Sequence, residues 1–126
     1  GGVELDLMGQ ENGESAGTRQ LSGIGGQMDF LEGAYRSKGG KGFICLNATQ
    51  KKKDGTIKSN IVPFIAGGST VSAPRTMVEY VVTEYGVANL PGKSLRERAE
   101  AMAAIAHPDF REELLKYAYE NFYLYL

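Results

Sequence analysis

The sequence predicts an α/β domain with a mixed sheet. Short β-prone runs alternate along the chain with segments in which apolar residues recur at helical spacing, which is the pattern of that class. The dipeptide Asp54-Gly55 is a hairpin signal between two β-prone runs, and a hairpin adds antiparallel pairing to the sheet. With 126 residues the chain is long enough to close its own hydrophobic core, so we expect one domain over residues 1–126.

The first third of the chain predicts a strand, a loop and a helix. Residues 3–8 alternate apolar with acidic side chains, as a half-buried strand does, and residues 9–17 have the Gly, Asn, Glu and Ser content of a loop. After Gly26, apolar residues recur at helical spacing, with Asp29 in the first turn, where an acidic side chain is favourable. Residues 37–40, Ser-Lys-Gly-Gly, end this short amphipathic helix.

Three β-prone runs occupy the middle of the chain. Residues 43–46 are a compact apolar run typical of a buried strand, and we expect Cys45 within it to be buried, reduced and structural. A lysine-rich turn at residues 51–55 leads into a second run, residues 56–64, which a proline interrupts near its end. Residues 77–83 form the third run and end before a Tyr-Gly pair.

The C-terminal third predicts an αα-hairpin. Ser94 and Glu97 have the spacing of a capping box, which indicates the start of a helix. Pro108 ends that helix, and we expect Asp109 with Glu112 to cap a second one. The predicted apolar faces are Leu95, Ala99, Met102, Ala103 and Ala106 in the first helix and Phe110, Leu114, Ala118 and Phe122 in the second.

Charge and composition exclude several classes of function. The net charge is −1 and the basic residues are dispersed, so the basic surface of a nucleic-acid-binding protein is not expected. No apolar run has membrane length and no signal peptide is recognisable, which predicts a cytoplasmic protein. One His and one Cys at distant positions predict no metal site. The chain begins Gly-Gly-Val without a methionine, and we expect it to be a piece of a longer protein.

Residues 21–30 organise the rest of the chain, because three glycines there run into the predicted helix start. A backbone with few Cβ atoms turns tightly and brings its N–H groups close to a ligand, and the helix adds partial positive charge. This predicts an anion or oxyanion site. Gly23, Gly25 and Gly26 miss the spacings of the dinucleotide fingerprint and the phosphate loop, so on local grounds a ligand-free strand-to-helix turn is the alternative.

Four motifs follow one another along the chain: Gly-Glu-Ser-Ala-Gly-Thr-Arg-Gln-Leu-Ser-Gly-Ile-Gly-Gly-Gln-Met-Asp-Phe at residues 13–30, Thr-Glu-Tyr-Gly-Val at 83–87, Gly-Lys-Ser-Leu-Arg-Glu-Arg-Ala at 92–99, and Ala-His-Pro-Asp-Phe-Arg at 106–111. In this order they closely resemble the C-terminal domain of the acetyl-CoA hydrolase/transferase family. The resemblance covers nearly the whole chain, and Gly-Lys-Gly-Phe-Ile-Cys-Leu at residues 40–46 is most similar to the butyryl-CoA:acetate and 4-hydroxybutyrate branch. It implies a CoA-transferase-like open sheet, largely parallel with a hairpin, flanked by helices.

The resemblance also implies an activity. Proteins of this family move CoA between short-chain carboxylates such as acetate, butyrate and 4-hydroxybutyrate through a glutamyl-CoA thioester. Their catalytic glutamate lies before this domain, so we expect an N-terminal domain carrying it to be absent from this chain and the chain alone to be inactive. CoA and acyl-CoA are substrates in this reaction, and no permanently bound cofactor is expected.

Site residues are carried over by position. Gly26 is similar in position to the family's oxyanion-hole glycine, and we expect Ser22 and Gly25 beside it to contact CoA. A Cβ at Gly26 would lie where the thioester carbonyl approaches, and each N–H donor to the developing oxyanion is worth about 3–4 kcal/mol. Lys51 matches a CoA-contacting lysine, whose charge suits the phosphates of CoA.

Other charged residues have weaker claims. Lys52 and Lys53 are interpreted first as a solvated hairpin tip and second as phosphate contacts. Lys38 and Lys41 are second-rank phosphate candidates. We expect Glu84, which precedes the Tyr-Gly pair, to be a buried, hydrogen-bonded carboxylate that fixes the neighbouring loop.

His107 is the one histidine and stands beside a helix end, where we expect it to cap carbonyl groups rather than act in catalysis. Asp29 is expected to serve the helix start that positions Gly26. Aromatic residues crowd the C-terminal end too closely for one helical stripe, which predicts packing against the missing domain or a subunit partner of a homo-oligomer. They are Tyr117, Tyr119, Tyr123 and Tyr125.

Two alternatives to a CoA-transferase stay open. One is a short-chain acyl-CoA hydrolase of the same family, in which water replaces the carboxylate acceptor. The other is a non-catalytic CoA-binding or interaction module. The sequence of this chain alone does not separate them.

Overall fold

The computed structural model describes residues 1–122. The elements in chain order are β1 (Glu4–Asp6), β2 (Glu11–Asn12), β3 (Ser15–Ala16), β4 (Arg19–Gln20), α1 (Gln27–Arg36), β5 (Phe43–Cys45), β6 (Thr49–Lys51), β7 (Ile57–Ser59), β8 (Ile61–Val62), β9 (Tyr80–Thr83), β10 (Gly86–Asn89), α2 (Leu95–Ala104) and α3 (Pro108–Asn121). The α/β class predicted from the sequence is confirmed.

The strands form two three-stranded sheets, ordered β2-β1-β8 and β10-β9-β5, and two ribbons, β3-β4 and β6-β7. The β1–β8 and β5–β9 pairs are parallel, and the other pairs between these strands are antiparallel. The pairing is therefore mixed, as predicted, but it is divided among small sheets instead of one open, largely parallel sheet. Each strand has only two to four residues, so each forms a short hydrogen-bonded ladder before the chain turns away.

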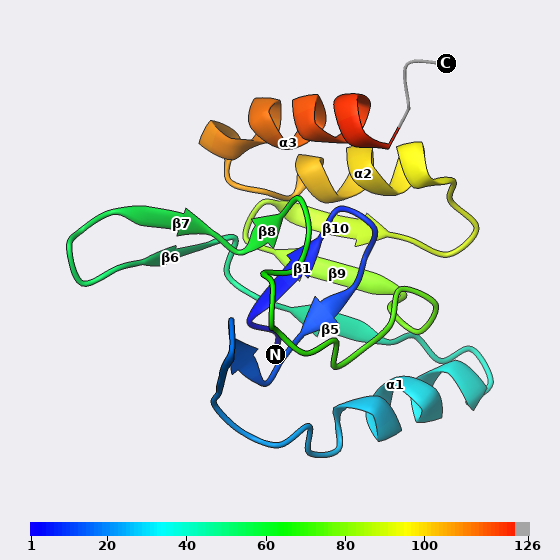
Figure 1. Ribbon diagram of the computed structural model, residues 1–126. Coiled ribbons are helices and arrows are strands. Elements are labelled where there is room, and N and C mark those ends of the chain that lie inside the picture. The colour runs from blue at the N-terminus through cyan, green and yellow to red at the C-terminus, as the bar shows by residue number, and fades with distance from the viewer. Residues whose placement is uncertain (123–126) are drawn as a thin grey trace.

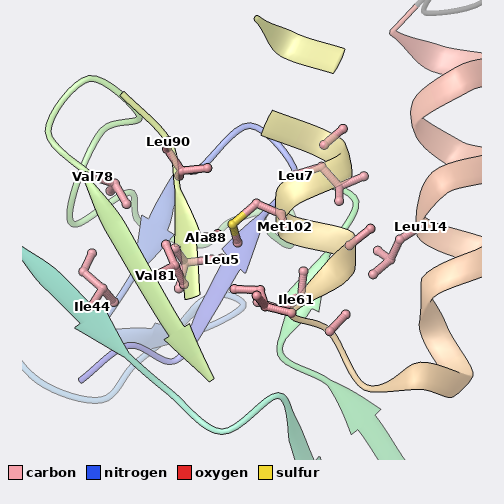
Figure 2. Packing of buried hydrophobic residues seen from close by; sticks show 14 of the residues in the cluster. Leu5, Leu7, Ile44, Ile61, Val78, Val81, Ala88, Leu90, Met102 and Leu114 are labelled. Carbon is pink, nitrogen blue, oxygen red and sulfur yellow. The ribbon is translucent and has the colours of Figure 1, made fainter. Parts of the chain in front are cut away.

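Figure 1 shows α2 and α3 side by side over one side of the sheets, with α1 on the opposite side and the β6–β7 ribbon projecting from the body. The buried core between these layers draws on both three-stranded sheets and on the helices. Figure 2 shows Leu5 and Ile61 from the first sheet, Val81 and Ala88 from the second, and Met102 from α2. These side chains are at most 2% exposed, so the sheets and α2 share one core.

Strand β1 is more deeply buried than the predicted half-buried strand. Its two acidic residues lie in polar networks inside the molecule. Glu4 Oε1 accepts hydrogen bonds from Asn12 Nδ2 and from the Ala66 N–H, both at 3.3 Å. Asp6 Oδ1 accepts from the Met8 and Gln10 N–H groups, both at 3.0 Å, although burial raises the pKa of this carboxyl. The acidic residues that alternate with apolar ones in this strand therefore make internal hydrogen bonds and do not form a solvated face.

The expected burial of Cys45 is wrong. Along β5 only Ile44 is buried, whereas Phe43 and Cys45 face outward. The strand lies at the edge of its sheet, and the core covers one of its faces. Phe43 stacks on Tyr80 of the adjacent strand with ring centroids 5.1 Å apart, so the outer face is an aromatic surface. The prediction of a buried strand from four consecutive apolar residues therefore overestimated how much of β5 is buried.

The third β-prone run forms a strand only from Tyr80 onward, and it is followed by a strand that the sequence did not predict. Gly86 begins β10, which pairs antiparallel with β9 in the register Gly86↔Thr83. The Tyr-Gly pair is thus part of a hairpin connection and not the end of the sheet.

The two C-terminal helices begin differently. Ser94 caps α2 through the predicted capping box, in which Ser94 Oγ accepts from the Glu97 N–H at 3.3 Å and the Ser94 N–H donates to Glu97 Oε2 at 2.7 Å. The predicted Asp109 cap of α3 is wrong. Pro108 occupies the first helical position, which suits its fixed φ, and this makes His107 the N-cap residue.

Candidate functional site

The glycine turn, residues 21–26, connects the β3–β4 ribbon to α1. Gly25 has φ +62°, in the left-handed region that favours glycine, and Gly26 is the N-cap residue of α1. Gly26 supplies no side-chain cap, and its carbonyl accepts the Phe30 N–H at 3.1 Å. The turn therefore presents backbone N–H groups at the positive end of a ten-residue helix without covering them by a side chain.

The fold leaves free space around this turn, and each of its residues is exposed. A Cβ built on Gly23 or Gly25 meets no other atom within 4 Å. At Gly26 the Cβ would lie 3.6 Å from the Phe30 ring, an ordinary contact, and φ is −95°. Packing within residues 1–122 thus does not require glycine at position 26.

Few hydrogen bonds tie the turn to the body of the domain. At its entry the Leu21 and Ser22 N–H groups donate to the Glu14 carbonyl at 2.8 and 3.2 Å. The Ser22 hydroxyl is exposed and donates to the adjacent Gly23 carbonyl at 3.0 Å. At the exit the first residue of α1, Gln27, donates from Nε2 to the buried Glu11 carboxylate.

Lys51 and the entry of the glycine turn lie on one depression. This open cavity of about 510 Å³ is bordered by Lys51 at the end of β6, by Leu21 and by Asn47. Ser22, Gly25 and Gly26 are outside its wall. Two residues that are thirty positions apart in the chain are therefore brought to the same hollow, with Ser22 one residue beyond its edge.

Two further depressions extend this surface. One of about 450 Å³ shares Asn47 with the first and reaches Cys45 and Thr83. The other, about 250 Å³, is lined by Gln27 and Phe30 of α1 together with other apolar residues. The surface beside the glycine turn is thus hollowed on both the β6 side and the β5 side.

The other lysine candidates lie farther out. Lys52 and Lys53 are exposed at the tip of the β6–β7 ribbon, where Asp54 Oδ1 accepts from the Thr56 N–H at 2.9 Å. Hydrogen bonds from Thr56 lower the pKa of Asp54. Lys38 follows the C-terminal end of α1, about 15 Å from Gly26 at the rise of 1.5 Å per helical residue. Of the three lysines Lys51, Lys52 and Lys53, only Lys51 borders the same depression as Leu21.

The expected burial of Glu84 is wrong, because this residue is exposed, but its carboxylate is hydrogen-bonded as expected. Its Oε1 accepts from the Ala48 N–H at 2.7 Å. Asp29 lies in the first turn of α1, with Oδ2 3.9 Å from the position of a Cβ on Gly26. This place agrees with a role in stabilising the helix start.

His107 serves a helix cap of the opposite polarity to the one expected. Its Nδ1 accepts the Asp109 N–H at 3.2 Å, so it satisfies a donor at the start of α3 and does not donate to carbonyls at the end of α2. The ring also makes edge contacts with Tyr85 and Phe110, at centroid distances of 5.6 and 6.0 Å. These contacts indicate a structural role for His107.

Tyr117 packs within the domain and not outward, with its ring centroid 5.7 Å from that of Phe64 and 5.9 Å from that of Phe122. Tyr119 borders a shallow groove between α2 and α3. Tyr123 and Tyr125 lie outside the described residues.

Sequence reasoning missed the Glu11–Gln27 pair that closes the exit of the turn. Glu11 falls in residues 9–17, which the sequence predicts to be a loop, and loop residues are normally solvated. The available signal was weak, since β2 has only two residues and its pairing with β1 is a tertiary feature.

Within residues 1–122, no three His, Cys, Asp or Glu side chains are grouped to hold a metal ion. In the same part of the chain, no helix has the length and apolar character needed to cross a membrane.

Comparison with known proteins gives a consistent result. Residues 1–118 match the family described as acetyl-CoA hydrolase/transferase C-terminal domain. The chain is 52% identical over 114 residues to butyryl-CoA:acetate CoA-transferase of Anaerostipes caccae, covering 90% of this chain and 26% of that protein. It is 53% identical over 113 residues to 4-hydroxybutyrate coenzyme A transferase of Clostridium kluyveri, covering 90% and 26%. A more distant relative, acetyl-CoA hydrolase of Candida glabrata, is 38% identical over 117 residues, covering 91% and 21%.

Solved structures show the same fold. RipA from Yersinia pestis is 44% identical and superposes with a TM-score of 0.82 over 94% of this chain and 26% of that protein. The 4-hydroxybutyrate CoA-transferase from Porphyromonas gingivalis is 46% identical, with a TM-score of 0.71 over 96% of this chain and 25% of that protein. The chain thus spans about a quarter of the length of these relatives.

Proposed function

Because the chain belongs to the acetyl-CoA hydrolase/transferase family, as its C-terminal domain, we propose that it supplies the oxyanion-binding and CoA-contacting part of a CoA-transferase. The whole enzyme would transfer CoA between a short-chain acyl-CoA and a carboxylate such as acetate, butyrate or 4-hydroxybutyrate. Relatives named for butyryl-CoA:acetate and 4-hydroxybutyrate transfer, at 52% and 53% identity, support these substrates.

The observation that carries the proposal is the conformation of the glycine turn. Gly26 stands at an uncapped helix N-terminus, is exposed and has room for a Cβ, so the fold itself does not account for the glycine. A carbonyl oxygen that must approach this backbone closely would account for it, because a Cβ would occupy its path. We assign Gly26 as the oxyanion-hole residue and Ser22 and Gly25 as its CoA-contacting neighbours.

Lys51 is assigned to the CoA molecule rather than to the reacting carbonyl. It borders the same depression as Leu21, at the entry of the turn. A fixed ammonium there suits a phosphate group of CoA. The turn and the lysine would then hold two ends of one extended substrate.

The chemistry that this arrangement serves is acyl transfer. A carboxylate oxygen attacks the thioester carbonyl carbon, the carbonyl oxygen takes the negative charge, and CoA thiolate leaves as the carbonyl re-forms. In the proposed enzyme the attacking carboxylate is a glutamate of an N-terminal domain outside this chain, and CoA thiolate then attacks the resulting anhydride to give glutamyl-CoA and release the carboxylate. Backbone N–H groups at the glycine turn stabilise the charge at each carbonyl that is attacked.

The test uses the full-length protein that contains this chain, incubated with butyryl-CoA. A CoA-transferase binds CoA covalently, detected by intact-protein mass, and passes it to labelled acetate. Hydrolysis of acyl-CoA without acceptor and without covalent CoA would support instead the hydrolase that the relative at 38% identity suggests. Absence of both activities would support a non-catalytic CoA-binding module.

A further inference from the structure

Glu11 is a carboxylate in an unfavourable place. It lies on β2 and is 0% exposed. Its backbone is paired on both sides, with Leu5 of β1 in the register and with Ala73, whose carbonyl accepts the Glu11 N–H at 3.0 Å. The side chain is therefore held inside the domain by its strand.

The carboxylate is only half satisfied. Oε2 accepts a hydrogen bond from Gln27 Nε2, while Oε1 is buried and has no hydrogen-bond partner within residues 1–122. Burial raises the pKa of Glu11 to about 7, and the nearby charge of Glu14 acts in the same direction. The hydrogen bond from Gln27 opposes this rise. A charged group with one neutral donor costs stability relative to an apolar side chain of the same size.

Within residues 1–122, the hydrogen-bond partner of this carboxylate is Gln27, the residue directly after the glycine turn. Gln27 is the first residue of α1 and directly follows Gly26. Gly13 allows the contact, because a Cβ there would lie 2.5 Å from Gln27 Oε1 and 2.7 Å from Glu11 Oε1. Since Gly26 has no side-chain cap and the turn is exposed, the Gln27 amide is the side-chain link between the exit of the turn and the sheet.

We propose that Glu11 is a positioning residue, which fixes the orientation of the Gly26 N–H through the side chain of Gln27. This inference rests on the proposed function of the glycine turn. The carboxylate touches neither the substrate nor the reacting atoms. It is retained at a cost in stability because the link locates the oxyanion donor.

The buried charge lowers stability and the link to Gln27 supports catalysis, so one substitution of Glu11 is expected to change stability and activity in opposite directions. Glu11→Met keeps the length of the side chain and removes the charge, so at pH 8 its thermal midpoint is expected to equal or exceed that of the wild type. The same change removes the acceptor for Gln27, and we expect kcat for CoA transfer to fall about tenfold, since misplacement of a catalytic group by an ångström is worth up to a hundredfold. The KM for acyl-CoA should stay within about twofold, because the Lys51 contact is unaffected.

Three further variants of the full-length enzyme make the test decisive. Glu11→Gln keeps an oxygen that accepts from Gln27 and should recover kcat to within about threefold of the wild type. Gln27→Met should show the same loss as Glu11→Met, and the double variant should lose no more than either single one. Asp6→Asn is the matched control, since Asp6 is also buried on the same sheet but bonds only to residues 8–10, and it should leave kcat unchanged.

The positioning role is wrong if Glu11→Met transfers CoA at the wild-type rate, or if kcat and the thermal midpoint fall together in both Glu11 variants. A Glu11→Met protein that does not fold would also contradict it, because the substitution is expected to stabilise. Failure of the proposed function has a different signature: the wild type would not transfer CoA, or a Gly26 variant would transfer it normally.

Discussion

Helices α2 and α3 and the glycine turn are held in place by opposite means. The helices bury side chains against the sheets and each other, with Met102 of α2 at 0% and Leu114 of α3 at 3% exposure, and α2 has a complete capping box. The turn is exposed throughout and is held at its entry by backbone hydrogen bonds and by the Gln20 side chain, and at its exit by the hydrogen bond from Gln27 to the buried Glu11 carboxylate.

This difference distinguishes residues whose identity is required by packing from residues whose identity is required by a ligand. Where packing decides the residue, a substitution leaves a cavity or a clash, as at Met102. At Gly26 the fold leaves room for a Cβ, so the absence of a side chain is explained by a ligand that binds close to the backbone. Substitutions in the two regions are therefore expected to change different quantities.

The largest effect on stability is expected at Met102, which is completely buried between α2 and the sheets. Met102→Ala should lower the free energy of unfolding by about 2–5 kcal/mol through lost burial and a cavity. At a temperature where the variant is folded, kcat should be unchanged. Denaturant unfolding and steady-state rates measure the two quantities. A large loss of kcat in folded Met102→Ala protein would contradict the view that the packed helices contribute to stability and not to catalysis.

The largest effect on activity is expected at Gly26. Gly26→Val should lower kcat about 10²–10³-fold by blocking the carbonyl and its donor, while the free energy of unfolding falls by about 1 kcal/mol for a poorer N-cap residue. Gly33→Ala is the control in the same helix, where a Cβ meets nothing within 4 Å. It should stabilise α1 and leave kcat unchanged. Equal losses of rate and stability in Gly26→Val would identify the glycine as purely structural.

Lys51 tests whether the depression beside the turn holds CoA. Lys51→Ala should raise the KM for acyl-CoA about tenfold, the loss of one charge-assisted hydrogen bond, with little change in kcat. Lys53→Ala at the tip of the same ribbon should leave KM unaltered. If both variants raise KM equally, the ribbon contributes only general positive charge.

The smallest effect is expected at the cap of α2. Ser94→Ala should cost about 1 kcal/mol of stability and leave the kinetic constants unchanged, because the cap lies in the packed region. Glu97→Gln, which keeps a group that can accept from the Ser94 N–H, should cost less. A measurable loss of turnover in either variant would connect this helix to the site.

Local signals in the sequence were sufficient for several elements. The capping box located α2, and Asp54-Gly55 located the β6–β7 ribbon, where the Asp54 side chain also accepts hydrogen bonds from Thr56. Both signals depend on residues within a few positions of one another.

Burial depended on contacts that a local pattern does not contain. Cys45 is exposed because the core covers only the face of β5 that carries Ile44, and Glu4 is buried where distant segments supply its donors. The same limit applies to the site. The glycines indicated an anion site from local chemistry, but the shared depression of Leu21 and Lys51 and the link from Glu11 to Gln27 arise only when separate segments pack together.

The central claim is that the glycine turn polarises the carbonyl of bound acyl-CoA. It is tested most directly by isotope-edited infrared spectroscopy of butyryl-CoA labelled with carbon-13 at the thioester carbonyl, bound to the full-length enzyme after its nucleophilic glutamate has been replaced by glutamine. Donation from the turn predicts that the carbonyl band moves to lower wavenumber on binding and returns toward its position in water in the Gly26→Val variant. A band that stays at its position in water while acyl-CoA saturates the protein would contradict the account.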